Sequence, residues 1–310
     1  MIKRTIEISR QPVHVSVRNR QLLLRSRVRQ SEQLLAEIPC EDIGLLLVDE
    51  QATTFTHGAL TALIDADAAV VLCGRDHLPV GMLVPFSTHT QVVQRLRHQL
   101  ALRPPLRKQL WRQLVQAKIR AQADLLLEGS ASRSRLMALA RSVRSGDPEN
   151  VEAQAARAYW ECFFGQRGFR RDPDARGLNA LLNYGYAVVR AAVARAIVAA
   201  GMLPALGIQH SNRSNAFCLA DDLLEPLRPM VDERVRDMAM EGFDDITPES
   251  KRPLLELLTR EVICGGQSGP LMVALHRYAA SLAGCFSGQR KILEIPTRID
   301  SDEPCPDADQ

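Results

Sequence analysis

The spacing of hydrophobic residues changes once along the chain. Up to about residue 85, apolar residues alternate with polar ones or form short runs bounded by Gly, Asp or Pro, as in RTIEIS, VHVSVRN, QLLLRS, DIGLLLVDE and AAVVLCG. This pattern predicts β-strands, with one short helix near residues 57–64. From Thr88 to about Gly288 the spacing is that of amphipathic helices with short polar breaks, including a long helix over residues 106–127.

The predicted fold is therefore α+β, with a small β-sandwich-like N-terminal domain over residues 1–88 and a larger all-α domain over residues 89–295. A length of 310 residues suits two domains. The segment KILEIPT is expected to form a short strand or an extended arm. Residues 296–310 are acidic and contain Pro, so they are predicted to be a disordered tail.

Charge is unevenly distributed, although the formal net charge is only +3. Twelve Lys and Arg residues lie between Gln91 and Ser145, against only Asp124 and Glu128. This basic block indicates a polyanion partner such as a nucleic acid, and a solvated helix surface is the alternative.

The cysteines and the N-terminal residues indicate the cellular compartment of the protein. Seven cysteines without a CxxC spacing favour a reducing, cytoplasmic setting, and no signal peptide is expected. The most apolar stretch, residues 178–201, contains Asn and Arg, so it is predicted to be a buried or interfacial helix and no membrane span is expected.

Candidate chemistry concentrates in HSNRSNAFCLADDLLEPLRP, residues 210–229. His210 lies in a turn bounded by Gly and Pro, and Asp222 and Glu225 have the i, i+3 spacing of one helix face. An imidazole and carboxylates without a thiolate suit Mg²⁺ or Mn²⁺ better than zinc. The alternative is an ordinary surface ion pair between Glu225 and Arg228.

A further acid, Glu152, begins an apolar helix face that includes Ala155 and Tyr159. The helix is expected to have Asp147 as its N-cap and to end near Phe164. If that face is buried, Glu152 must meet a cation or a metal. Alternatively, it is a first-turn Glu that interacts with the helix dipole. Because GxSxG, GxGxxG and GxxxxGK[ST] are all missing from the sequence, an α/β-hydrolase site or a nucleotide-cofactor fold is not indicated.

In combination, GDPENVEAQAARAYWECFFG, LNALLNYGYAVVRAAVARAIVAAGMLPALGIQH and NRSNAFCLADDLLEPLRP resemble the CRISPR-associated protein 1 family, the integrase and DNA endonuclease of spacer acquisition. The similarity extends to about residue 295 and is strongest to the branch found with type II systems. It implies Glu152, His210 and Glu225 as catalytic metal ligands for Mg²⁺ or Mn²⁺, with Asp222 as a supporting acid. Close relatives often have two or three consecutive histidines where this chain has Gln209, His210 and Ser211.

The resemblance also implies a reaction and partners. The 3′-hydroxyl of a prespacer DNA would attack a phosphodiester at the end of a repeat, with DNA backbone held by the basic block. The expected contacts are Lys118, Arg120, Arg141 and Arg144. Family members form homodimers through the β domain and assemble with CRISPR-associated protein 2, and an RNA-guided effector nuclease is a further candidate partner. A catalytically decayed DNA-binding scaffold and a general metal-dependent nuclease are the alternatives.

Overall fold

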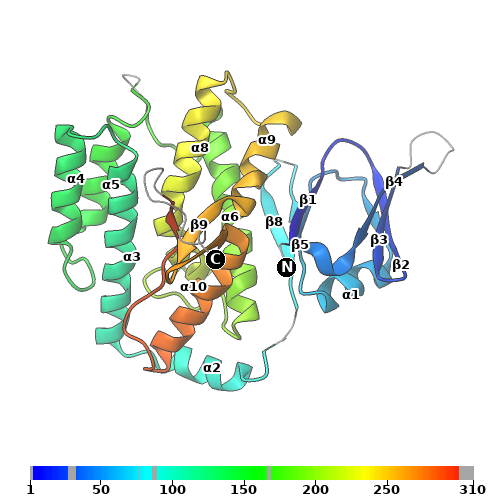
Figure 1. Ribbon diagram of the computed structural model, residues 1–310, viewed down its shortest axis with the longest axis horizontal. Helices are drawn as coiled ribbons and strands as arrows, with labels where there is room; N and C mark the ends of the chain where they lie inside the picture. The colour runs from blue at the N-terminus through cyan, green and yellow to red at the C-terminus, as the bar shows by residue number, and fades with distance from the viewer. Residues whose placement is uncertain (1–2, 27–32, 76, 86–88, 166–168, 300–310) are drawn as a thin grey trace, which may run out of the picture.

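The computed structural model describes residues 3–26, 33–75, 77–85, 89–165 and 169–299. It contains both sheets and helices, so the predicted α+β class is confirmed, with strands concentrated in the N-terminal part and helices in the rest (Figure 1). Residues 86–88, at the predicted domain boundary, and residues 300–310, most of the predicted tail, lie outside the described residues.

One N-terminal sheet has the strand order β1-β5-β7-β8, formed by Arg4–Ile8, Ile43–Val48, Ala69–Cys73 and Pro79–Leu83. The first three strands are parallel, and β8 is antiparallel to β7. All six residues of β5 are buried. A strand that is apolar along its whole length is stable where both faces of its sheet are covered.

The second sheet covers one of these faces. Its order is β4-β3-β2-β6, formed by Gln33–Pro39, Gln21–Ser26, Val13–Arg18 and Thr54–Phe55. The β2–β3 hairpin turns at Asn19 and Arg20, whose positive φ values of 51° and 61° are those of a two-residue type I′ turn. Apolar residues from both sheets and from helix α1 (His57–Asp65) form one core.

The remainder of the chain is mainly helical. Helix α6 lies at its centre (Figure 1), and although it is long and apolar enough to span a membrane, 78% of its most apolar 18-residue window is buried inside the protein. It is therefore a core helix. The helices are α2 (Val92–Leu100), α3 (Pro104–Asp124), α4 (Ala131–Ser142), α5 (Val151–Trp160), α6 (Leu178–Ala199), α7 (Cys218–Leu224), α8 (Arg228–Met240), α9 (Pro248–Leu255) and α10 (Leu271–Phe286), with short 3-10 turns η2 (Glu225–Leu227) and η3 (Glu256–Thr259). A further 3-10 turn, η1 (Cys40–Asp42), lies between β4 and β5.

The prediction that the C-terminal part is all-α is wrong. A three-stranded antiparallel sheet with the order β10-β9-β11 lies among the helices, formed by Gln267–Pro270, Glu261–Cys264 and Thr297–Arg298. These strands have at most four residues, too few to show an alternating pattern. Most of KILEIPT is not strand, because β11 begins only at its last residue, Thr297.

The β-rich and helical parts share a core. Leu45 and Leu47 of β5 and Val71 of β7 belong to the same buried cluster as the central residues of α6. The outer face of the first sheet therefore packs against the helices. The change in secondary structure near residue 86 is not a boundary between independent cores.

Candidate active site

The start of α5 fixes the position of Glu152. The helix begins at Val151, after Asn150 in the left-handed conformation (φ 53°, ψ 46°), so Asp147 is not its N-cap residue. The Asp147 carboxylate nevertheless accepts hydrogen bonds from the backbone N–H groups of Val151 at 2.8 Å and Glu152 at 3.0 Å. These bonds satisfy two of the amides that a helix start leaves unpaired. The helix ends at Trp160, earlier than expected, and Glu152 lies in its first turn.

The cation that meets Glu152 is Lys118 of α3. Its Nζ donates to Glu152 Oε1 at 2.6 Å and to Glu225 Oε2 at 2.5 Å. The Lys118 side chain is only 11% exposed, so both ion pairs are shielded from water. Burial alone lowers the pKa of Lys118, but the nearby carboxylates of Glu225 and Glu152 outweigh burial and raise it. Lys118 is therefore a positive charge between two acids.

Glu225 begins η2, where the α7 helix gives way at Pro226. Its second oxygen, Oε1, accepts a hydrogen bond from Arg228 Nε at 2.8 Å, so the pair that the sequence offered as the alternative to a metal ligand does form. The Glu225 side chain is 7% exposed, which makes this pair a buried one and not a surface one. Burial raises the pKa of Glu225, but the charges of Arg228 and Lys118 together have the larger effect and lower the pKa to about 2. Glu225 is ionised at neutral pH.

A buried polar cluster supports Arg228. Its guanidinium carbon lies 4.5 Å from the ring centroid of Tyr186, a favourable cation–π distance. The hydroxyls of Tyr186 and Tyr159 both donate to the fully buried carboxylate of Asp232. Burial raises the pKa of Asp232 to about 7, although the two tyrosine hydrogen bonds act in the opposite direction.

Asp222 organises the loop that carries His210. Its carboxylate is completely buried and accepts backbone N–H hydrogen bonds from Ile208 at 2.5 Å, Gln209 at 3.1 Å and His210 at 3.1 Å. It also contacts the His210 ring at Nδ1, at 2.7 Å. This hydrogen bond is the main cause that raises the pKa of His210. With Nδ1 engaged, Nε2 is the ring nitrogen left to bind a ligand.

The tight path of this loop requires glycine at position 207. A Cβ atom there would lie 2.3 Å from the carbonyl oxygen of His210 and 2.8 Å from Asp222 Oδ2. Any side chain would force the loop away from the carboxylate. Gln209 contributes only its backbone N–H to Asp222 among the described contacts, and the residue is exposed.

Helix α3 connects the two parts of the site. Trp111, on the buried face of α3, packs edge-on against the His210 ring with 6.0 Å between centroids, and Lys118 reaches the carboxylates from the same helix. The charge of Glu225 is among the causes that raise the pKa of His210, which places the two residues within electrostatic reach. Among the described residues, however, no three His, Cys, Asp or Glu side chains already form a metal-ligand group.

The predicted DNA contacts separate into two classes. Arg120, Arg141 and Arg144 are exposed, and Arg144 forms a surface ion pair with Glu149. The prediction that Lys118 belongs to this basic surface is wrong, because its ammonium group is enclosed by Glu152 and Glu225. The spacing of Trp111, Val115, Lys118 and Gln122 along one helix face was the signal that could have revealed its burial.

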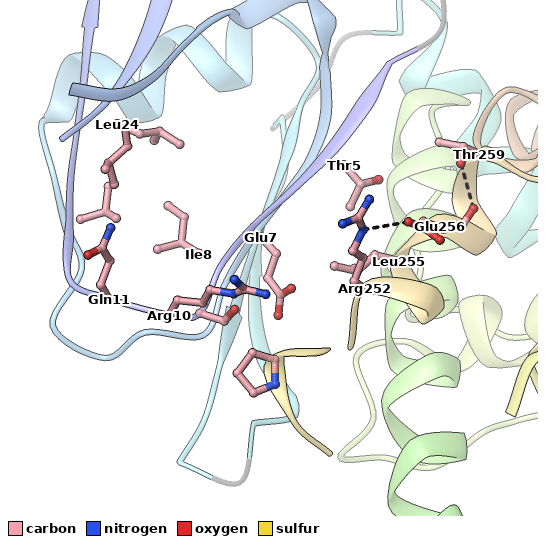
Figure 2. A pocket seen from close by; sticks show the side chains of 14 residues that line it. Thr5, Glu7, Ile8, Arg10, Gln11, Leu24, Arg252, Leu255, Glu256 and Thr259 are labelled. Atoms are coloured by element: carbon pink, nitrogen blue, oxygen red, sulfur yellow. Dashed lines mark hydrogen bonds and ion pairs between the residues drawn. The ribbon is translucent and has the colours of Figure 1, made fainter. Parts of the chain in front are cut away.

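A separate groove of about 430 Å³ lies where β1 meets α9 and η3 (Figure 2). Glu7 and Arg10 line it from the β1 side, and Arg252 and Glu256 line it from the helical side. Arg252 Nε already pairs with Glu256 at 3.0 Å. The groove is lined by both acidic and basic side chains, which partly neutralise one another. The carboxylate cluster around Lys118 is therefore the stronger candidate for catalysis.

Comparison with known proteins identifies related chains. The family described as CRISPR associated protein Cas1 matches residues 6–243. The chain is 36% identical over 287 residues to a CRISPR-associated endonuclease Cas1 of Neisseria meningitidis serogroup C, covering 91% of this chain and 92% of that protein.

Two solved structures share the fold. A casposase bound to integration product superposes with a TM-score of 0.77 at 18% identity, covering 97% of this chain and 96% of the other. A chain of a Cas6-RT-Cas1–Cas2 complex gives a TM-score of 0.72 at 17% identity, covering 94% of this chain and 36% of the other.

Proposed function

The chain belongs to the Cas1 family of CRISPR-associated proteins, and from this membership we propose that it is a divalent-metal-dependent DNA endonuclease and integrase of spacer acquisition, of the kind found with type II systems. One observation carries the proposal. Two carboxylates from distant parts of the chain, Glu152 and Glu225, meet around one cation, and His210, oriented by Asp222, lies within electrostatic reach of Glu225.

The side chains fit a hard divalent cation. Glu152, Glu225 and His210 Nε2 would hold Mg²⁺ or Mn²⁺, because carboxylate oxygens and one imidazole are the donors that these ions accept. The position between the two carboxylates already accommodates a positive charge. When bound, the metal polarises the phosphate and lowers the pKa of the attacking hydroxyl.

The residues around the site set the charge of Glu225 and the hydrogen bonding of His210. Arg228 and Lys118 hold Glu225 ionised, and Asp222 engages Nδ1 of His210, which leaves Nε2 as the ring nitrogen available to a ligand. In the proposed reaction, the 3′-hydroxyl oxygen of the prespacer forms a bond to a phosphorus of the repeat, and the bond from that phosphorus to the 3′-oxygen of the repeat strand breaks. The attacking hydroxyl loses its proton, and the leaving 3′-oxygen takes one up. One phosphodiester is exchanged for another without a covalent enzyme intermediate. Positioning of the 3′-hydroxyl against the repeat phosphate contributes much of the rate.

The partners of the protein are part of the same proposal. The structural relatives are a casposase bound to integration product and a complex that contains Cas1 and Cas2. By analogy, this chain would bind prespacer and repeat DNA, form a homodimer through its N-terminal β domain and assemble with a Cas2 protein, with an RNA-guided effector nuclease as a further partner. The exposed arginines of α3 and α4 would contact DNA phosphates.

The direct test supplies the purified chain with its Cas2 partner, a prespacer with free 3′-hydroxyls, a repeat-containing plasmid and Mn²⁺ or Mg²⁺. Joining of prespacer strands at the two repeat ends, abolished when EDTA is added, is the expected result. DNA binding without any joining would favour a decayed scaffold. Degradation of DNA without joining at the repeat would favour a general nuclease.

The DNA surface can be tested separately. Replacing Arg120, Arg141 and Arg144 together with Glu should weaken DNA binding and reduce the slope of log K against log[salt] by about 0.9 for each phosphate that the protein no longer neutralises. Arg252→Glu is the matched control, because Arg252 has an 81% exposed side chain on α9, outside the basic block. Equal affinity and slope in the triple variant and the wild type would show that the block is only a solvated face.

A further inference from the structure

Lys118 is the least expected member of the site. Residues 91–145 are all described by the structure, and Lys118 is the buried residue among the twelve Lys and Arg of that basic block. Burying an ammonium group is costly unless it is paired. Its two partners are the carboxylates of Glu152 and Glu225, the same groups that the proposed function assigns to a metal.

The geometry is that of a cation shared between two ligands. The contacts of 2.6 and 2.5 Å limit the separation of Glu152 Oε1 and Glu225 Oε2 to at most the sum of these distances. An Mg²⁺ ion would bind the same two oxygens at about 2.0–2.1 Å. Both cations therefore require the same space and the same oxygen lone pairs.

The second oxygen of Glu225 already accepts the hydrogen bond from Arg228, so the oxygen that faces Glu152 is the one that Lys118 holds. A metal that takes both carboxylates must displace Lys118 or share its oxygen. Sharing would place a divalent cation and an ammonium group within a few ångströms, with strong like-charge repulsion in a poorly hydrated site.

We propose that Lys118 is a positioning residue that occupies the divalent-cation position between Glu152 and Glu225 in the metal-free protein, and that metal binding displaces its ammonium group. This inference rests on the proposed metal site. Lys118 keeps the two acids together while no metal is bound, since the buried carboxylate of Glu225 and the half-buried carboxylate of Glu152 would otherwise repel each other. It also competes with the metal, so it lowers the apparent metal affinity.

If Lys118 competes with the metal, removing its charge raises the Mn²⁺ affinity. If Lys118 only supports the two ligands, removing its charge lowers the Mn²⁺ affinity. Lys118→Met keeps an unbranched side chain and removes the charge. Under competition, the variant binds Mn²⁺ on the order of tenfold more tightly than the wild type, equivalent to one charge-assisted hydrogen bond, as measured by titration calorimetry or by EPR of free Mn²⁺. Its metal-free form melts at a lower temperature, and Mn²⁺ raises that temperature more than in the wild type. Lys108→Met, an exposed lysine on the same helix, is the control and should leave both quantities unchanged.

A second measurement uses the wild type, so it does not depend on the variant folding. Amine-selective labelling followed by mass spectrometry should find Lys118 protected without metal and more reactive with saturating Mn²⁺, while Lys108 reacts equally in both. Weaker Mn²⁺ binding by Lys118→Met, or unchanged protection of Lys118 when Mn²⁺ is bound, overturns the inference and leaves the metal site standing. If instead Glu152→Ala and Glu225→Ala bind Mn²⁺ as the wild type does, the metal site itself is wrong.

Discussion

Glu225→Gln is expected to reduce the rate of DNA integration by about 10³-fold, through loss of about 4 kcal/mol of charge stabilisation by the metal. Glutamine keeps the shape of the side chain but supplies no negative charge between Lys118 and Arg228. The metal then loses an anionic ligand, and the two buried cations lose their shared partner. Glu152→Gln should act in the same direction.

The measurement is strand joining at the repeat ends under single-turnover conditions, with DNA affinity determined in parallel. DNA binding should survive, because the exposed arginines are unchanged. Glu256→Gln is a matched control, since its side chain is 56% exposed on η3 and lies in the separate groove of Figure 2. If Glu225→Gln and Glu152→Gln both join strands at the rate of the wild type, these residues are not catalytic.

Lys251→Ala is expected to lower the free energy of unfolding by about 3–5 kcal/mol, the range for removing one partner of a buried ion pair. Lys251 of α9 pairs with Asp49, which follows β5, and their side chains are 3% and 2% exposed. The pair joins the β-rich part to the helical part. Without Lys251, the Asp49 carboxylate keeps only the contact with His77 Nδ1, at 2.9 Å, among its described side-chain partners.

Urea unfolding followed by circular dichroism measures this loss. Asp49→Asn combined with Lys251→Met should recover much of the stability, because removing both charges leaves no unpaired ion in the core. The adjacent Arg252→Ala removes only a surface pair with Glu256 and should cost less than about 1 kcal/mol. A loss for Lys251→Ala as small as that for Arg252→Ala would contradict the importance of the buried pair.

Local patterns in the sequence were sufficient for much of the architecture. The apolar runs of the first 85 residues are strands, and the predicted short helix is α1, His57–Asp65. The apolar stretch at 178–201 is the core helix α6, as its length and internal polar residues indicated. These features depend on residue spacing within a single element, which is visible along the chain.

The sequence was less informative about the start of α5 and about the short C-terminal strands, which depend on local hydrogen bonds and on contacts with distant segments. Asp147 does bind the start of α5, but through an extra turn at Asn150, so the helix begins later than its sequence suggests. The strands β9, β10 and β11 are stabilised by pairing with one another, and none has an alternating pattern long enough to detect. Such short strands form because other segments of the folded chain pair with them, and this pairing is not visible in the local sequence.

The candidate site also has some features that the sequence predicts and others that only the tertiary structure reveals. The sequence was enough to identify Glu152, His210, Asp222 and Glu225 as candidate residues. It also offered the Glu225–Arg228 pair as an alternative, because i, i+3 spacing sets which side chains meet on a helix. Only the tertiary structure showed that Lys118 lies between Glu152 and Glu225, 34 and 107 residues away in the chain. The identity of a residue does not reveal which charge it will face after folding. That choice is made by the packing of α3 against α5 and η2, which turns one lysine of a basic block inward while its neighbour Arg120 remains in water.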